Sequence, residues 1–240
     1  MTPPPIVEVA DDAEALACLA ARFIAARASN ATEPFGLCLS GGSTPKRVYE
    51  LLGAKDFGAA LDWQRVHLFW GDERFVPADH RDSNFRMARE ALIDHVPIPA
   101  AQVHPVPTNS ASPEEAAALY EATLQSFYGS KTLDPERPLF DVTLLGLGED
   151  GHTASLFPGT KALDERDAWV TSILGVKPEP RISLTYPALQ SSRLILFVVS
   201  GAKKRDILGR VLANDMTLPA VRLATRGTIH IFADREAIAS

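Results

Sequence analysis

Short apolar segments alternate with helical patterns along most of this chain, and that alternation limits its possible folds more than any other feature. Runs typical of strands lie at residues 35–39, 66–70, 140–145, 169–173, 182–185, 193–199 and 228–232. Capping residues and apolar spacing predict helices that begin near Asp11, Ser43, Asn84, Ser112 and Lys203. Strands alternating with helices predict right-handed crossovers, so we expect an α/β fold with a mostly parallel sheet and helices on both faces.

The length of the chain allows either one large domain or two small ones, since it has 240 residues. Its proline-rich pieces, at residues 3–5, 97–107 and 178–180, are typical of surface connections rather than of linkers between domains. We therefore expect residues 1–240 to form a single domain.

Charge and hydropathy argue against several classes of protein. The formal net charge is −6, whereas a nucleic-acid-binding protein normally has a basic excess. The longest strongly apolar run, residues 194–199, is too short to span a membrane, and the first residues lack the pattern of a secretory signal. We expect a cytoplasmic protein whose partner is a small molecule, not a nucleic acid or a membrane.

The two cysteines, Cys18 and Cys38, fall in a helical pattern and in a strand-like run. We expect both to be buried, reduced thiols, as is usual in cytosolic proteins. Neither the cysteines nor the six histidines have the spacing of a zinc site, so the sequence predicts no bound metal.

A polar loop follows each of four predicted strands. These loops are residues 40–44, 71–74, 146–152 and 200–205. The carboxyl ends of parallel strands meet at one edge of a sheet, which is where open α/β sheets bind ligands. Together the loops carry small hydrogen-bond donors, carboxylates, a histidine and basic side chains, so the sequence predicts an active site there.

The loop Ser40–Thr44 is a candidate anion site. Gly41 and Gly42 allow a close approach to backbone N–H groups, Ser43 and Thr44 add hydroxyl donors, and the following helix presents its positive dipole end. Lys204 can add a point charge to the same anion. The alternative is a tight turn in which Ser43 or Thr44 caps the helix, with Lys204 an exposed surface lysine.

Residues 146–151 match the pattern G-x-G-x-x-G, but His152 and Pro158 interrupt the helix that a dinucleotide-binding loop requires. We therefore favour a catalytic loop and expect no cofactor. His152 is the leading candidate for catalysis because it lies in a glycine-flanked loop at the expected sheet edge. A structural histidine is the alternative.

Asp72 and Arg74 place a carboxylate and a cation within three residues, either in the site or as a surface ion pair. Arg181 precedes a short strand and can reach either the site or solvent.

Five motifs together resemble the 6-phosphogluconolactonase family, which is related to the glucosamine-6-phosphate isomerases. They are LSGGSTPK (39–46), WGDERFVP (70–77) with DSNFRMA (82–88), GLGEDGHTASLFP (146–158), RISLT (181–185) and GAKKR (201–205). The resemblance implies a Rossmann-like sheet similar to that of glucosamine-6-phosphate deaminase. It also implies hydrolysis of 6-phospho-D-glucono-1,5-lactone, the second step of the oxidative pentose phosphate pathway, without a metal or an organic cofactor. We expect a monomer or a weak homodimer.

The residues can perform this chemistry. His152 can act as the general base that deprotonates a water attacking C1, and Arg74 or backbone N–H groups can stabilise the charge on the carbonyl oxygen. Asp72 can orient the histidine, a water or the sugar hydroxyls. The resemblance assigns the 6-phosphate to Gly41, Gly42, Ser43, Thr44, Lys204 and Arg181.

Two other functions remain open. Sugar-phosphate isomerase-deaminases are similar in their glycine and histidine loops, but that family has a glutamate five residues after the histidine, where this chain has Phe157. A sugar-phosphate sensor would need a DNA-binding module, for which the chain has no basic helix.

Overall fold

Six parallel strands form the central sheet of the computed structural model, which describes residues 4–58 and 61–238. In spatial order they are β1 (Ile6–Ala10), β9 (Thr228–Asp234), β8 (Leu194–Val199), β5 (Val142–Leu145), β2 (Phe35–Leu39) and β3 (Val66–Trp70). Every residue of β2, β5 and β8 is buried. Strands buried on both faces need continuous apolar sequence, which is why these three segments were recognisable.

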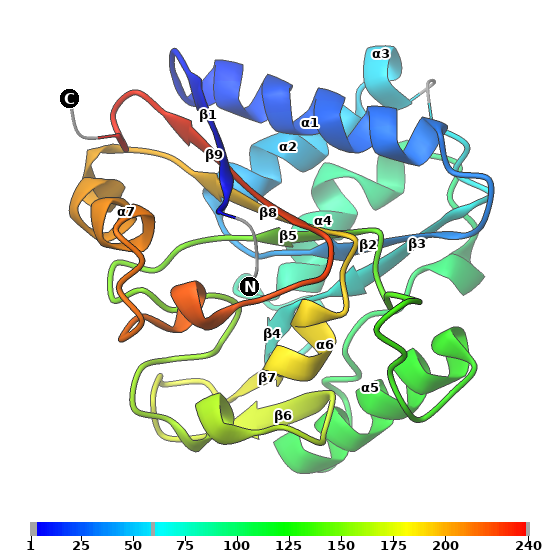
Figure 1. Ribbon diagram of the computed structural model, residues 1–240. Coiled ribbons are helices and arrows are strands. Elements are labelled where there is room, and N and C mark those ends of the chain that lie inside the picture. Colours follow the sequence, from blue (N-terminus) through cyan, green and yellow to red (C-terminus); the bar gives the residue numbers. More distant parts are fainter. Residues whose placement is uncertain (1–3, 59–60, 239–240) are drawn as a thin grey trace.

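Helices and a second sheet cover the two faces of the central sheet. The helices are α1 (Ala13–Ser29), α2 (Ser43–Gly53), α3 (Lys55–Gly58), α4 (Asn84–Ala91), α5 (Pro113–Tyr128), α6 (Tyr186–Gln190) and α7 (Arg205–Leu212). Short 3-10 turns are η1 (Ile93–His95), η2 (Ala100–Gln102), η3 (Lys161–Asp164), η4 (Ala202–Lys204) and η5 (Pro219–Arg222). In Figure 1, α1 and α2 lie above the sheet, whereas α5 and α6 lie below it. The predicted α/β fold is therefore confirmed.

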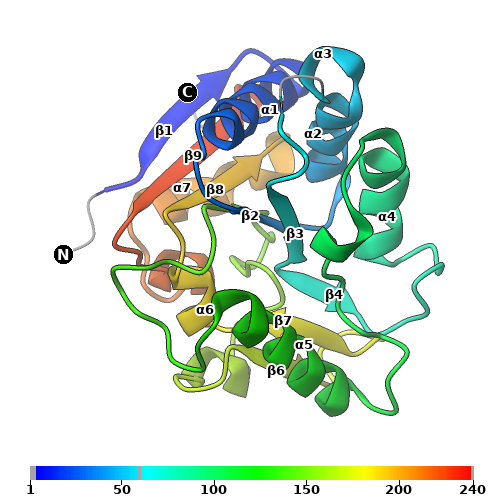
Figure 2. The same ribbon diagram turned by 90° about the vertical axis from the view of Figure 1, so that its right-hand side faces the viewer.

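The second sheet is antiparallel and was not predicted. It contains β4 (Asp72–Arg74), β7 (Arg181–Leu184) and β6 (Val170–Ile173), in that order. The strands expected at 169–173 and 182–185 exist, but they belong to this second sheet, which packs with α5 on the lower side of Figure 2. The segment 72–74, expected to be a loop, is β4. Apolar alternation predicts a strand but does not tell which sheet it joins.

Several local predictions were wrong. The sequence did not predict β1, an edge strand with exposed Ile6, Val7 and Val9. Asp12, not Asp11, caps α1 by accepting a hydrogen bond from the N–H of Ala15. Among the cysteines, which are both free thiols, Cys38 is buried but Cys18 is only partly so.

No helix within residues 4–58 and 61–238 is both long and apolar enough to cross a membrane.

Candidate active site

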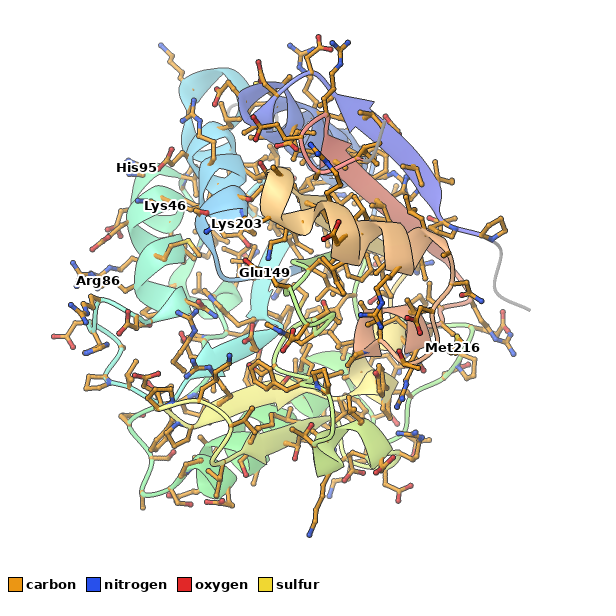
Figure 3. The ribbon with its side chains drawn as sticks, turned by 90° about the vertical axis from the view of Figure 1, so that its left-hand side faces the viewer. Lys46, Arg86, His95, Glu149, Lys203 and Met216 are labelled. Atoms are coloured by element: carbon orange, nitrogen blue, oxygen red, sulfur yellow. The ribbon has the colours of Figure 1, made fainter. Side chains whose placement is uncertain are left out.

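A cavity of about 280 Å3 lies at the carboxyl ends of the parallel strands. It brings together eight of the nine residues predicted for the site, namely Gly41, Gly42, Ser43, Thr44, Asp72, Arg74, His152 and Lys204. Figure 3 views the molecule from the side on which α7 lies, with Glu149 and Lys203 labelled on the loops that follow β5 and β8. The expected convergence of four loops is therefore observed.

The anion loop lies between β2 and α2. The residue before the helix is Gly42, with φ of 110°, and no side chain caps the helix. In the alternative drawn from the sequence, Ser43 or Thr44 caps this helix, but both are its first helical residues. Their hydroxyl groups, together with the free N–H groups of the first turn, are therefore available to a bound anion.

Lys204 reaches the same cavity from the other side of the sheet, at the junction of η4 and α7. Its side chain is half-buried. Among the described residues, its ammonium group has no hydrogen-bond or ion-pair partner. A half-buried cation without a carboxylate partner favours a bound anion.

His152 is held by a carboxylate two residues before it. Asp150 Oδ1 lies 2.5 Å from the His152 ring Nδ1 and also accepts the His152 backbone N–H at 3.1 Å. Partial burial raises the pKa of Asp150, but these hydrogen bonds outweigh it and leave the pKa below its usual value. Asp150 is thus an ionised acceptor, which makes Nδ1 the protonated nitrogen and leaves Nε2 able to accept a proton.

The loop backbone permits this arrangement only because of a glycine. A Cβ at Gly148 would lie 2.1 Å from Nδ1 of His152, so any side chain there would displace the ring. The Gly148 N–H also donates to the His152 carbonyl at 2.8 Å. The pattern G-x-G-x-x-G therefore supports a histidine here, as the sequence predicted, and does not open a helix.

Ala154 has a strained backbone, with φ of 47°. A left-handed conformation costs a non-glycine residue roughly 1–2 kcal/mol. The backbone turn at Ala154 allows one short loop to provide both His152 and Ser155. In the same loop, the Thr153 hydroxyl donates to the Gly146 carbonyl at 2.9 Å. Strain of this kind is typical of functional sites.

Asp72 is fixed by Ser155, a contact that sequence reasoning missed. The buried Ser155 hydroxyl donates to Asp72 Oδ2 at 2.6 Å. The carboxylate therefore has one oxygen occupied and one available to the cavity. The sequence had left open what Asp72 orients, and this contact does not include His152.

Glu73, the residue after Asp72, does not line the cavity but fixes residues that do. It is 1% exposed, and its carboxylate accepts hydrogen bonds from the backbone N–H groups of Arg74, Asn84 and Phe85. Burial raises its pKa, and these backbone hydrogen bonds oppose the rise. It anchors the start of α4, and thereby Asn84, whose side chain lines the cavity and lies against Gly41. Asn84 belongs to the motif DSNFRMA, but the sequence did not predict it as a site residue.

Arg74 lines the main cavity and an adjoining one of about 330 Å3, and one of its N–H groups donates to the Asp82 carbonyl at 2.6 Å. The second cavity also contains Lys46, Arg81 and Arg86, of which Lys46 and Arg86 are labelled in Figure 3. The same cavity contains Asp82 and Glu90, which pair with Arg81 and Arg86, so cations outnumber carboxylates in its lining although several are already paired.

Arg181 is the predicted site residue that the main cavity does not include. It lies directly opposite Arg74 in the β4–β7 pair, and its guanidinium contacts both the carbonyl and the carboxylate of Glu179. With its charge already paired, Arg181 is a neighbour of the site in this structure rather than part of its wall.

Comparison with known proteins places this site in a family. Residues 11–231 match the model for glucosamine-6-phosphate isomerases/6-phosphogluconolactonase. The chain belongs to this family. A 6-phosphogluconolactonase from Nostoc sp. is 44% identical over 230 residues, covering 93% of this chain and 92% of that protein. One from Mycobacterium leprae is 37% identical over 243 residues, with 97% of each chain covered.

Solved structures agree with the family assignment. The 6-phosphogluconolactonase from Thermotoga maritima has a TM-score of 0.82 and 31% identity, covering 96% of this chain and 100% of that one. A monomeric glucosamine-6-phosphate deaminase has the same fold, with a TM-score of 0.82 at 22% identity. The family predicted from the motifs is thus confirmed, as is the prediction of an enzyme of the lactone hydrolase type.

Proposed function

We propose that this enzyme hydrolyses 6-phospho-D-glucono-1,5-lactone to 6-phosphogluconate, with His152 as the general base. One observation carries the proposal: a histidine oriented by Asp150 shares a cavity with an uncapped helix N-terminus and with Lys204, whose ammonium group has no partner in the described part of the chain. The relatives named 6-phosphogluconolactonase support the same substrate.

The reaction begins at Nε2 of His152. Because Asp150 holds the proton on Nδ1, Nε2 takes a proton from a water as its oxygen attacks C1 of the lactone. The carbonyl oxygen gains negative charge, and Arg74 is the cation in the cavity wall that stabilises it. The ring C–O bond of the tetrahedral intermediate then breaks, and the histidine returns the proton to the departing ring oxygen. The carboxylic acid product loses a proton to solvent at neutral pH.

The phosphate end of the substrate is held by the loop before α2. The first-turn N–H groups, the hydroxyls of Ser43 and Thr44, and the Lys204 ammonium together match a dianion. Asp72, with one oxygen fixed by Ser155, accepts a sugar hydroxyl with the other. The lactone is thereby aligned between its anchor and the base.

The deaminase alternative is disfavoured by the surroundings of the histidine. The buried Phe157 ring lies 4.5 Å from the His152 ring, centroid to centroid. An apolar ring at that position cannot exchange a proton with the imidazole. The carboxylate that orients the base is therefore that of Asp150. This arrangement suits a hydrolysis, because a hydrolysis needs only one proton acceptor.

Proton release on freshly prepared phosphogluconolactone tests the function, with glucosamine 6-phosphate as the control substrate and spontaneous hydrolysis subtracted. We expect catalysed acid release from the lactone and no ammonia from the amino sugar. Ammonia release without lactone hydrolysis would replace the proposal by the deaminase alternative.

A further inference from the structure

Asp234 is a buried carboxylate at the end of β9, outside every motif that identified the site. It is 2% exposed. It accepts hydrogen bonds from the Ser200 hydroxyl at 2.5 Å, from the Gly201 N–H at 3.0 and 3.1 Å, and from the Ala237 N–H at 2.9 Å. A carboxylate buried this deeply is stable only when such donors surround it.

Two of these donors belong to the loop that carries Lys204. Gly201, with φ of 93°, donates its N–H to Asp234. Its carbonyl oxygen accepts the backbone N–H of Lys204 at 2.9 Å. A continuous path of two hydrogen bonds therefore joins the Asp234 carboxylate to the backbone of Lys204. Ser200, which precedes Gly201 and lines the cavity, donates its hydroxyl hydrogen to the same carboxylate.

The Ser200 hydroxyl is committed by this contact. A hydroxyl has one hydrogen, and Ser200 donates it to Asp234, so its oxygen can only accept a hydrogen bond from a ligand. A fully ionised phosphate has no hydrogen that it could donate to the Ser200 oxygen. The phosphate contact on this side of the cavity is therefore left to Lys204, whose long side chain depends on the position of its backbone.

We propose that Asp234 is a positioning residue for phosphate recognition: it fixes the 200–204 loop so that the Lys204 ammonium meets the 6-phosphate. This inference rests on the proposed function, because it takes the phosphate to lie at Lys204. Asp234 acts through the loop and contacts no substrate atom itself.

The test compares two substrates in Asp234→Asn. The amide keeps the size of the side chain but replaces one of the two oxygens that accept the Gly201 N–H by an NH2 group, which cannot accept it. We expect kcat/KM for the phosphorylated lactone to fall by about tenfold or more, mainly through KM. For glucono-1,5-lactone, which lacks the phosphate, we expect a change of less than about twofold.

Asp141→Asn is the matched control. Asp141 is a partly buried carboxylate whose pKa is raised by burial, and, like Asp234, it accepts a backbone N–H, that of Gly36 at 2.9 Å. It precedes β5, at the opposite edge of the sheet from the cavity. We expect Asp141→Asn to change thermal stability while leaving the ratio of the two kcat/KM values unchanged.

Lys204→Ala separates failure of this inference from failure of the proposed function. If Lys204→Ala lowers the ratio of kcat/KM values but Asp234→Asn leaves it unchanged, or lowers both efficiencies equally, the positioning role is wrong and the phosphate site stands. If Lys204→Ala itself leaves the ratio unchanged, the phosphate does not lie at Lys204, and both the positioning role of Asp234 and the assignment of Lys204 to the phosphate are overturned, whereas the proposed hydrolysis is decided separately by proton release.

A second variant decides the question if Asp234→Asn does not fold. In Gly201→Ala, a Cβ meets no atom within 4 Å, but the backbone at φ of 93° is strained, so the loop shifts without losing the buried carboxylate. Gly129→Ala, at φ of 74° and equally open, strains the backbone at the end of α5, although its left-handed helical conformation costs an alanine less than that of Gly201. We expect a phosphate-specific loss in Gly201→Ala alone; equal behaviour of the two variants would overturn the proposal.

Discussion

The carboxylate of Asp150 holds the imidazole of His152, which lines the cavity, at 2.5 Å between Oδ1 and Nδ1. Two residues of one loop thus hold a histidine in a single tautomer before any substrate binds. The loop geometry, and not a distant element of the fold, sets the orientation of the proposed base.

Replacement of the base should nearly abolish catalysis. His152→Ala removes the proton acceptor, and we expect kcat to fall on the order of a hundredfold or more with the fold intact. His95→Ala is the control, because His95 lies outside the cavity at the surface. Stopped-flow proton release and circular dichroism measure the two effects. A well-folded His152→Ala enzyme with normal kcat would refute the assignment.

Asp150→Asn tests the tautomer. An amide NH2 at this position can donate to Nδ1 and so place the ring hydrogen on Nε2, which then cannot accept a proton from water. We expect kcat to fall by about tenfold or more while KM changes little. Glu149→Gln, one residue earlier and at the surface, serves as control and should retain activity. Similar kinetics in the two variants would show that Asp150 does not orient the base.

Arg74 should matter to the transition state more than to substrate binding. We expect Arg74→Ala to lower kcat and kcat/KM together, because charge on the carbonyl oxygen develops only during the reaction. Arg74→Lys, which keeps the charge, should recover part of the loss. If KM alone rises, Arg74 belongs to the phosphate site instead.

The 6-phosphate should contribute to rate as well as to affinity. Glucono-1,5-lactone has the same reactive ester without the anchor, and we expect its kcat/KM to be lower by roughly a thousandfold or more. Ser43→Ala combined with Lys204→Ala should narrow this difference by impairing only the phosphorylated substrate. Equal efficiency on the two lactones would mean that the loop before α2 is only a turn.

Acid should destabilise the fold through a pair of histidines remote from the cavity. Nδ1 of His67 lies 3.1 Å from Nε2 of His104, whose ring stacks on Phe69. Burial, followed by repulsion from His67, lowers the pKa of His104 to about 4, and burial lowers that of His67. The unfolded chain, with a histidine pKa of about 6.5, therefore binds more protons, and stability falls as the pH falls from about 6.5 toward 4.

His104→Asn isolates this effect from the buried carboxylates Glu73 and Asp141, whose raised pKa values act in the opposite direction. We expect the melting temperature of the unsubstituted protein to fall more between pH 7 and pH 5 than that of His104→Asn. Parallel pH profiles in calorimetry would contradict the prediction.

The sequence predicted the place of the site in the fold better than the contacts that fix its side chains. Parallel strands end at a common edge, so the loops carrying Ser43, His152 and Lys204 had to converge once the strands were recognised. The contacts of Ser155 with Asp72 and of Asp234 with Gly201 join segments distant in the chain, and no local pattern indicates them. Arg181 shows the reverse case: its motif is in place, but in this structure its charge is paired with Glu179.

The pairing of β1 with β9 has a consequence for how the protein is synthesised. β1 lies at the edge of the sheet, and its single neighbour there is β9, which also carries Asp234. A ribosome adds about 5–20 residues per second, so β1 waits many seconds for its partner to emerge. During that time the exposed Ile6, Val7 and Val9 have nothing to pair with. A nascent chain lacking β9 leaves both β1 and β8 without a neighbouring strand, as well as the 200–204 loop without its anchor, so we expect activity to appear only once β9 has been synthesised.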